Sequence, residues 1–296
     1  MIISQATDIR TLIRAYITLT KPRIIMMLLF TALGGLFLAS RGVPDLATTL
    51  LVLVGGTLAS AGANALNQSM DRDIDEAMRR TQTRPVVVGM IPSHHAVIFG
   101  IAVNIIAFIL LASLVNVLSA VLTLGATLFY VIVYTKALKR TSTQNIVIGG
   151  AAGAIPPMVG WTAVTGTIGL PAIYLFAIVF FWTPPHFWAL ALLLKDDYAR
   201  AKVPMLPVVA GVWETKKSIL LYTVLMLALT SMFYATGAVG LIYLVSSAVA
   251  GVLFIYYAWR LLRNPEIQGA KGLYLYSLLY LAILFTAIIV DSLVKF

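Results

Sequence analysis

Long apolar segments run through almost the whole chain, and they restrict its possible folds more than any other feature. An α-helix of about 20 apolar residues crosses the hydrocarbon core of a bilayer, because each residue adds about 1.5 Å of length. The chain is 60% hydrophobic and 11% charged. Its apolar segments lie at about 24–40, 46–66, 95–113, 117–135, 146–164, 171–194, 218–236, 239–259 and 274–293. We therefore expect an all-α polytopic membrane protein with nine transmembrane helices.

Basic residues gather in alternate loops. Of the 21 Lys and Arg residues, 19 lie within residues 10–23, 72–84, 136–140, 195–217 and 260–271, and only Arg41 and Lys295 lie on the other side. Cytoplasmic loops carry such an excess, so we expect a cytoplasmic N-terminus and a periplasmic C-terminus. The net charge of +10 thus indicates contact with a lipid bilayer and no role in binding nucleic acid.

The sequence is similar to itself at a shift of 122 residues, which superimposes spans one to four on spans five to eight. The shift pairs Asp75 with Asp197. Both halves start on the same side, which indicates a parallel 4+4 pseudo-repeat, with chance similarity as the alternative. We expect a single domain over 1–296, with repeats at about 20–140 and 142–262 and a ninth helix at about 274–293.

Three polar residues, Asn67, Asp71 and Asp75, follow each other at intervals of four where the second apolar segment ends. Residues i, i+4 and i+8 of an α-helix lie on one face. Neighbouring carboxylates repel each other, and a hard cation such as Mg²⁺ relieves the repulsion while leaving positions free for a phosphate. The spacing therefore predicts a Mg²⁺ site, with a solvated helix end as the alternative. Asp73 points to another face and is expected to be solvated.

A second acidic cluster, Asp196 and Asp197, ends the equivalent helix of the other half, so we expect the two clusters to face each other. Basic residues are interleaved with both clusters: Arg79, Arg80, Arg84, Lys195, Arg200 and Lys202. A metal ion alone would not need these cations, and the acids would repel an anion alone. A diphosphate bound together with a metal ion satisfies both groups of charges.

The loops that carry the acidic clusters are long, at about 68–94 and 195–217. Long ordered loops over one face of a bundle often act as lids, so we expect cytoplasmic lids above the site. Residues 9–20 alternate apolar and polar positions at helical spacing, which predicts an interfacial helix.

The pattern formed by Asn67, Asp71 and Asp75 resembles the first Asp-rich motif of the UbiA-type intramembrane prenyltransferases. Further segments resemble one branch of that superfamily, the protoheme IX farnesyltransferases or haem O synthases. They lie at 19–23, 64–67, 83–85, 134–136 with 139–140, 149–157, 183–188 and 197–198 with 204–207. The Thr-Pro-Pro-His-Phe-Trp and Pro-Met-Leu-Pro segments make the resemblance to this branch specific.

The resemblance implies transfer of a farnesyl group from farnesyl diphosphate to a vinyl group of haem B, with addition of water, to give haem O. Haem B would be a substrate, and Mg²⁺ the cofactor. The resemblance also implies a bacterial inner membrane location with the active site on the cytoplasmic side. Hand-over of the product to a terminal oxidase or a downstream haem-modifying enzyme would follow.

The same resemblance assigns Mg²⁺ binding to Asn67, Asp71 and Asp75. Asp196 and Asp197 match the second motif only in part, because the superfamily usually has further acids three or four residues later. Here Arg200 and Ala201 stand at those positions. The assignment of Mg²⁺ to the second cluster is correspondingly weaker.

Four residues inside the spans are candidates for a haem or prenyl cavity. The repeat aligns Asn64 with His186, so both are expected to face the centre. His186 would contact haem iron or else be hydrogen-bonded within the break made by the two preceding prolines. Trp182 and Trp188 would line the cavity or belong to packing and the interfacial aromatic belt.

Tyr134 and Lys136 end the fourth apolar segment, close to the expected diphosphate. We predict that both act at the reaction centre, with direct phosphate contact. Lys21, in the first motif of the branch, would act there too or serve only as a positively charged membrane anchor.

Three other functions are compatible with parts of the pattern. A UbiA-type enzyme could use a quinone-precursor aromatic acceptor in place of haem. A secondary transporter also has duplicated helical halves, but transporters place ionisable residues near the middle of the bilayer, whereas these lie at one face. A non-catalytic haem-binding protein would have no use for two acidic clusters.

Overall fold

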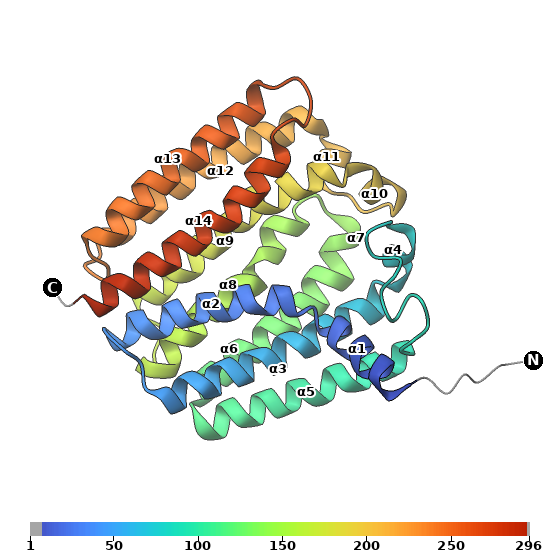
Figure 1. The fold of residues 1–296 in the computed structure, drawn as a ribbon, viewed down its shortest axis with the longest axis horizontal. Helices are drawn as coiled ribbons and strands as arrows, with labels where there is room; N and C mark the ends of the chain where they lie inside the picture. The colour runs from blue at the N-terminus through green and yellow to red at the C-terminus, as the bar shows by residue number, and fades with distance from the viewer. Residues whose placement is uncertain (1–7, 295–296) are drawn as a thin grey trace, which may run out of the picture.

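The computed structural model describes residues 8–294, which fold into a helical bundle (Figure 1). Within those residues, nine helical segments are long and apolar enough to cross a membrane. They are α2 (Pro22–Ser40), α3 (Leu46–Met70), α5 (Ser93–Leu114), the continuous run of α6 (Val117–Leu128), the π-helix η1 (Phe129–Leu138) and α7 (Lys139–Thr141), α8 (Asn145–Thr165), α9 (Leu170–Leu193), α12 (Gly211–Tyr234), α13 (Leu241–Arg263) and α14 (Ala270–Leu293). The expected all-α fold with nine membrane helices is confirmed.

The short helices gather at one end of the bundle, which we call the polar end (Figure 1). They are α1 (Ile9–Thr20), α4 (Arg72–Ala77), α7, α10 (Lys195–Arg200) and α11 (Leu206–Val209). The helix expected at residues 9–20 is present. Its Ile9, Ile13 and Ile17 are exposed at intervals of four while Leu19 is buried, as suits a helix lying on a membrane surface.

The fourth and seventh membrane spans extend furthest beyond the ends that hydropathy predicted at the polar end. The fourth span continues from the expected residue 135 to Thr141, and the seventh begins at Gly211 in place of residue 218. In both cases the added turns carry Lys or Arg, which lower the mean hydropathy but do not end a helix. The extension of the fourth span brings Lys139 and Arg140 to the site described below.

The helices that open the two predicted repeats, α2 and α8, pack directly against each other. Two glycines allow this contact. A methyl group placed on Gly160 would lie 2.1 Å from the carbonyl oxygen of Ala32, and one on Gly35 would lie 2.1 Å from that of Pro157. Backbone therefore meets backbone here, which is the usual reason for small residues at a membrane helix interface. The boundaries of the repeats stay a prediction.

The substitution Gly160→Ala is therefore expected to lower the melting temperature of the purified protein. Ala favours a helix by about 1 kcal/mol over Gly, but overpacking costs about 1–3 kcal/mol, and more where backbone must move. Gly153→Ala in the same helix is the matched control, because an added methyl group there meets nothing within 4 Å. Equal melting temperatures for the two variants would contradict the close α2–α8 contact.

Candidate active site

Asn67, Asp71 and Asp75 lie at the polar end, where α3 passes into α4. The backbone leaves helical geometry for a single residue at Asp71, with φ −94° and ψ 11°. The N–H of Asp71 still donates to the carbonyl of Asn67 at 2.9 Å, and that of Asp75 donates to the carbonyl of Asp71 at 2.8 Å. The three side chains are only 3%, 0% and 2% exposed. They therefore share one buried face, as their spacing predicts.

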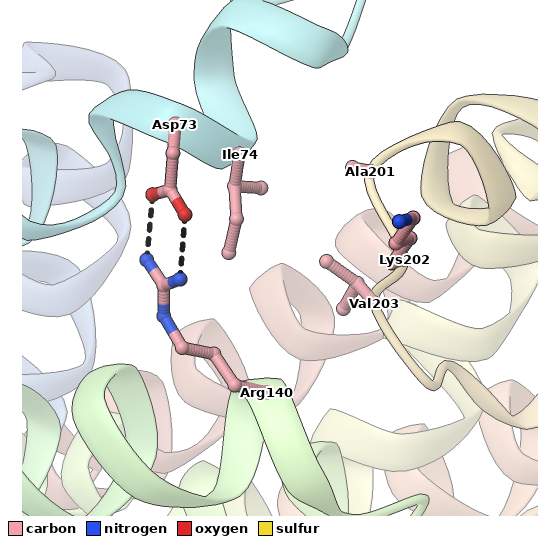
Figure 2. A pocket seen from close by; sticks show the side chains of 6 residues that line it. All are labelled: Asp73, Ile74, Arg140, Ala201, Lys202 and Val203. Atoms are coloured by element: carbon pink, nitrogen blue, oxygen red, sulfur yellow. Dashed lines mark hydrogen bonds and ion pairs between the residues drawn. The ribbon is translucent and has the colours of Figure 1, made fainter.

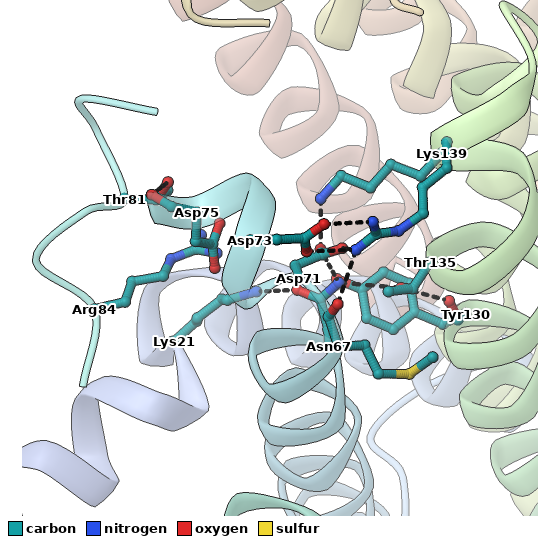
Figure 3. Close-up of polar contacts among 12 residues, drawn as sticks. Lys21, Asn67, Asp71, Asp73, Asp75, Thr81, Arg84, Tyr130, Thr135 and Lys139 are labelled. Carbon is teal, nitrogen blue, oxygen red and sulfur yellow. Dashed lines mark hydrogen bonds and ion pairs between the residues drawn. The ribbon is translucent and has the colours of Figure 1, made fainter. Parts of the chain in front are cut away.

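Each carboxylate of this face is paired with a cation from another segment (Figure 3). Lys139 Nζ lies 2.5 Å from Asp71 Oδ2, and Arg84 Nη1 lies 2.5 Å from Asp75 Oδ2. Arg84 comes from the loop that was expected to form a lid, and Thr81 of the same loop donates to the carbonyl of Asp75 at 3.0 Å. The loop is thereby fixed onto the acidic face.

Asn67 connects the acidic face to two further segments. Its Nδ2 donates to Asp71 Oδ2 at 2.7 Å and to Thr135 Oγ1 at 3.0 Å, and its Oδ1 accepts from Lys21 Nζ at 2.8 Å. Burial and the nearby charges of Arg84 and Lys139 lower the pKa of Lys21 to about 7. An anion bound beside Lys21 would stabilise its charged form.

The π-helix η1 determines which lysine of the fourth span reaches Asp71. Its i→i+5 hydrogen bonds widen each turn, and Thr135 Oγ1 accordingly donates to the carbonyl of Tyr130 five residues earlier, at 2.9 Å. Lys139 follows directly and contacts Asp71, whereas Lys136 is exposed. The structure therefore places Lys139, and not the predicted Lys136, at the acidic face.

Asp73 is exposed, as expected, but it is not merely solvated. Both of its carboxylate oxygens accept from the Arg140 guanidinium at 2.7 Å, which lowers the pKa of Asp73. Figure 2 shows this pair on one side of a cavity of about 280 Å³, with Ala201 to Val203 of the second lid loop on the other side. Nη2 of Arg140 also lies 3.9 Å from Asp71 Oδ1.

The second acidic cluster does not join the first. Asp196 is exposed, and Asp197 is paired with Arg200 within α10. Among residues 8–294, no three His, Asp or Glu side chains converge in a way that could hold a metal ion. The lid loops instead meet through apolar side chains: Ile74 and Met78 of the first, and Tyr198, Val203 and Met205 of the second. Metal binding by Asp196 and Asp197 thus has no support from this geometry.

The predicted diphosphate-binding cations are differently placed. Arg84 forms an ion pair with Asp75, and Arg200 forms an ion pair with Asp197. Lys202 lines the cavity of Figure 2, while Arg79 and Arg80 are exposed on the first lid loop and Lys195 is half-buried at the start of α10. Burial raises the pKa of the Tyr198 hydroxyl, and the charges of Arg80 and Arg84 oppose this shift, so both arginines lie near it.

Tyr134 packs beside the acidic face through its ring. The ring stacks on that of Tyr130 with centroids 5.5 Å apart. A methyl group on Gly149 of α8 would lie 2.3 Å from the Tyr134 ring, so the glycine makes room for it. The two tyrosines thus form an aromatic wall next to Asn67 and Asp71.

The four cavity candidates have different surroundings. Asn64 donates to the carbonyl of Thr20 at 2.9 Å and so anchors α1, a contact that gives no support to a cavity role. Trp188 is buried and packs edge-on against Tyr222 with centroids 5.2 Å apart. Trp182 and His186 stack on each other at 4.3 Å and face α14.

The acidic face has the donor atoms that Mg²⁺ prefers. Asn67, Asp71 and Asp75 offer oxygen atoms only, and Asp71 Oδ1 is buried without a hydrogen-bond partner. An unpartnered buried carboxylate oxygen is costly unless something else coordinates it. The residues of the first cluster therefore fit a divalent metal ion.

Sequence reasoning left four contributors out of the predicted site: Thr135, Lys139 and Arg140, and Lys21, which had an equally good explanation as an anchor. All four are part of segments that carry the family resemblance, which was the available signal. No pattern in the sequence distinguishes Lys139 from Lys136, because the π-helical phase decides between them.

Nine membrane-length helices within residues 8–294, with buried pairs of carboxylates and cations at one end, define a membrane-embedded helical protein with a polar site at that end. The UbiA prenyltransferase family matches residues 28–288, and the chain belongs to this family. Protoheme IX farnesyltransferase of Rippkaea orientalis (strain PCC 8801 / RF-1) is 49% identical over 95% of this chain and 88% of its own length. That of Roseiflexus sp. (strain RS-1) is 51% identical over 96% of this chain, which spans only 53% of that relative.

The fold is also similar to that of a solved structure, a UbiA homologue from Archaeoglobus fulgidus bound to GPP and Mg²⁺. The TM-score is 0.69 at 19% identity, with 93% of this chain and 99% of that chain covered. This likeness shows that the two proteins share one fold.

Proposed function

We propose that this protein transfers the farnesyl group of farnesyl diphosphate to a vinyl group of haem B and forms haem O. Relatives at about 50% identity that carry the name protoheme IX farnesyltransferase support the substrates. The observation that carries the reaction class is the buried face on which Asp71 is paired with Lys139 and Asp75 with Arg84. In prenyl transfer the diphosphate leaves as an anion bound to a metal ion. This face has cations for the diphosphate and carboxylates for the metal ion.

The cations of the site would bind the diphosphate. Lys139 and Arg84 reach the carboxylates, so they also reach an anion bound directly beside them, and Lys21 lies on the same face. Four cations, including Arg140, stand against the three carboxylates Asp71, Asp73 and Asp75. Preorganised positive charge of this kind stabilises a leaving group as its negative charge develops.

Asn67, Asp71 and Asp75 would hold Mg²⁺, which supplies Lewis-acid stabilisation of the departing diphosphate. The GPP and Mg²⁺ bound to the Archaeoglobus homologue support a metal-dependent reaction on a prenyl diphosphate. Our proposal leaves out Asp196 and Asp197, because Asp197 is paired with Arg200 and Asp196 is exposed.

The reaction balances with one molecule of water. The C1–O bond of farnesyl diphosphate breaks, and the diphosphate keeps the electron pair. The terminal carbon of the haem vinyl group forms a bond to C1, which leaves a cation on the vinyl carbon next to the porphyrin. Water adds to that carbon and loses a proton, which gives the hydroxyethylfarnesyl group of haem O. The Tyr130–Tyr134 wall lies beside the diphosphate site, where electron-rich rings would stabilise an allylic cation.

The membrane location is part of the proposal. We assign the protein to the bacterial inner membrane, as the family resemblance implies, and the distribution of Lys and Arg supports a polar end that faces the cytoplasm. The C-terminal end of α14 lies opposite the polar end, as an odd number of spans requires (Figure 1). A product with a farnesyl tail would stay in the bilayer, from which a terminal oxidase or a further haem-modifying enzyme would receive it.

Membranes that contain the protein are expected to convert haem B and farnesyl diphosphate into a product heavier by one farnesyl group and one hydroxyl group, in a Mg²⁺-dependent reaction. Mass spectrometry of extracted haem measures this product. A parallel incubation with 4-hydroxybenzoate as acceptor tests the quinone-precursor alternative. Prenylation of the benzoate without any haem product would overturn the assignment of haem as the acceptor.

A further inference from the structure

A stripe of exposed side chains runs along the outer side of α13, one of the helices at the edge of the bundle (Figure 1). Its apolar part consists of Val245, Val249, Val252 and Tyr256, which are 49–59% exposed. Intervals of three and four residues place them on one side of the helix. α13 packs against α12 and α14, so its other sides are covered. The stripe therefore faces the hydrocarbon chains of the bilayer.

The stripe changes character at the polar end, where Trp259, Arg260 and Arg263 continue it at the same spacing. All three are exposed, and the guanidinium carbon of Arg263 lies 5.4 Å from the centroid of the Trp259 ring. Tryptophan prefers the headgroup level of a bilayer, and an arginine near a helix end extends its charge to the phosphates. Hydrocarbon, indole and guanidinium thus follow one another along α13 in the order in which a phospholipid presents its chains, esters and phosphate.

The positive charges at this end of α13 are not neutralised by the protein. Arg260, Arg263 and Lys271, the last at the start of α14, are exposed, and none of them forms an ion pair within residues 8–294. Glu266 of the intervening loop is exposed and pairs with none of them. Three cations without a partner favour an anion at this surface.

The neighbouring helix α12 provides a contrast. Its exposed Trp213 also has a cation over the ring, Lys217 at 6.0 Å, and an exposed apolar residue, Leu221, follows one turn later. Lys217, however, forms an ion pair with Glu214 at 2.7 Å. Both helices therefore carry the interfacial pattern, and of the two it is α13 whose cations stay unpaired in the described part of the chain.

A buried lysine fixes the helix ends around these cations. Lys216 is 2% exposed, and its Nζ donates to the carbonyl of Asn264 at 2.8 Å, which ties the start of α12 to the end of α13. Asn264 Nδ2 donates to the carbonyl of Gln268 at 3.0 Å and holds the loop toward α14 on the same end. Lys216 has no carboxylate partner among residues 8–294. A buried ammonium of this kind is costly, and an anion at the adjacent surface would offset part of the cost.

We propose that Arg260, Arg263 and Lys271 bind the phosphate of an anionic phospholipid whose acyl chains lie along the α13 stripe. A guanidinium binds phosphate through two parallel N–H donors, so neighbouring arginines suit this group. A zwitterionic lipid would bring a further positive charge to the same cations and should bind more weakly. The site lies on α13 and α14, so it is separate from the acidic face and does not depend on the proposed reaction.

Native mass spectrometry of the purified, delipidated full-length protein in detergent tests the proposal. Wild-type protein is expected to bind one molecule of phosphatidylglycerol about 10-fold to 30-fold more tightly than phosphatidylcholine with the same acyl chains, as two lipid-facing arginines would give. The double variant Arg260→Gln with Arg263→Gln should lose this preference.

The matched control is the double variant Arg10→Gln with Arg14→Gln, which removes the same charge from exposed positions of α1. It should keep the preference, whereas a general excess of basic residues would attract anionic lipid to every basic segment alike. Equal affinities of the two lipids in the wild type, an unchanged preference in the α13 variant, or the same loss in both double variants would overturn the site.

Trp259→Leu provides a second test, with Trp213→Leu as its control. Loss of the stacked indole on α13 should weaken phosphatidylglycerol binding about two-fold to five-fold, because an exposed cation–π contact is modest. Trp213→Leu should change it by less than about two-fold, since Lys217 is already paired with Glu214. Equal effects in the two variants would contradict the assignment to α13. Melting temperatures should stay near that of the wild type because the side chains are exposed, and a loss of lipid binding confined to destabilised variants would count against the site.

Discussion

Replacing Asp71 with Asn is expected to lower the rate of farnesyl transfer by about 1,000-fold, because several kcal/mol of leaving-group stabilisation depends on the metal and cations at this position. Asp71 is fully buried, accepts from both Asn67 and Lys139, and has one oxygen, Oδ1, without a hydrogen-bond partner. An amide keeps the shape of the side chain but loses the charge that a divalent ion and Lys139 require. The turnover number with saturating Mg²⁺ and farnesyl diphosphate is the quantity to measure.

Asp73→Asn is the matched control for this substitution. Asp73 lies two residues away in the same segment, but its side chain is 67% exposed and its partner is Arg140. An exposed pair contributes up to about 1 kcal/mol, so its loss should change the rate far less. Breaking a buried pair costs about 3–5 kcal/mol of stability, so melting temperature and monodispersity must be checked for Asp71→Asn. Folded Asp71→Asn protein with near wild-type turnover would refute the role of the acidic face.

The number and order of membrane helices could be predicted from the sequence because a bilayer leaves few alternatives. Backbone groups in hydrocarbon must be paired within the segment, so a long apolar run becomes a helix whatever its neighbours are. Helix ends are less constrained. Lys136 and Lys139 in the fourth span, and Lys216 in the seventh, continue their helices where hydropathy alone predicted an end.

The acidic face could also be predicted, since it depends only on the spacing of Asn67, Asp71 and Asp75 along one helix. Most of its cations could not, because they come from a loop, from the junction of α1 and α2, and from the short helix α7 that follows the π-helix. Six basic residues were predicted to bind the diphosphate, and only one of them, Arg84, contacts the acidic face.

The repeat suggested equivalences that the two halves do not keep. The repeat aligns Asp197 with Asp75. Asp75, however, forms an ion pair with Arg84, nine residues later in its loop, whereas Asp197 forms one with Arg200, three residues later in α10. Asn64 was aligned with His186, but Asn64 anchors α1 and His186 faces α14. A backbone equivalence between repeats does not fix side-chain partners, because the segments packed around each half differ.

Lys139→Met is expected to lower the rate of farnesyl transfer by about 100-fold, the effect of removing one preorganised charge from a developing anion. The Lys139 ammonium lies 2.5 Å from Asp71 and is only 12% exposed. Met keeps most of the apolar stem and so preserves packing. Because Lys139 would stabilise the leaving diphosphate, the turnover number should fall more than the affinity for farnesyl diphosphate, and Lys139→Arg should restore part of the loss by returning the charge.

Lys136→Met tests the same side-chain change three residues earlier in η1, at an exposed position. Loss of an exposed charge costs less than about 1 kcal/mol, so its rate should stay within a few-fold of wild type. The comparison distinguishes the two registers of the fourth span. The sequence analysis predicted Lys136 at the reaction centre, whereas the structure, in which a π-helix precedes Lys139, presents Lys139 to Asp71. A severe loss in Lys136→Met with little change in Lys139→Met would show that the functional helix does not have the π-helical register.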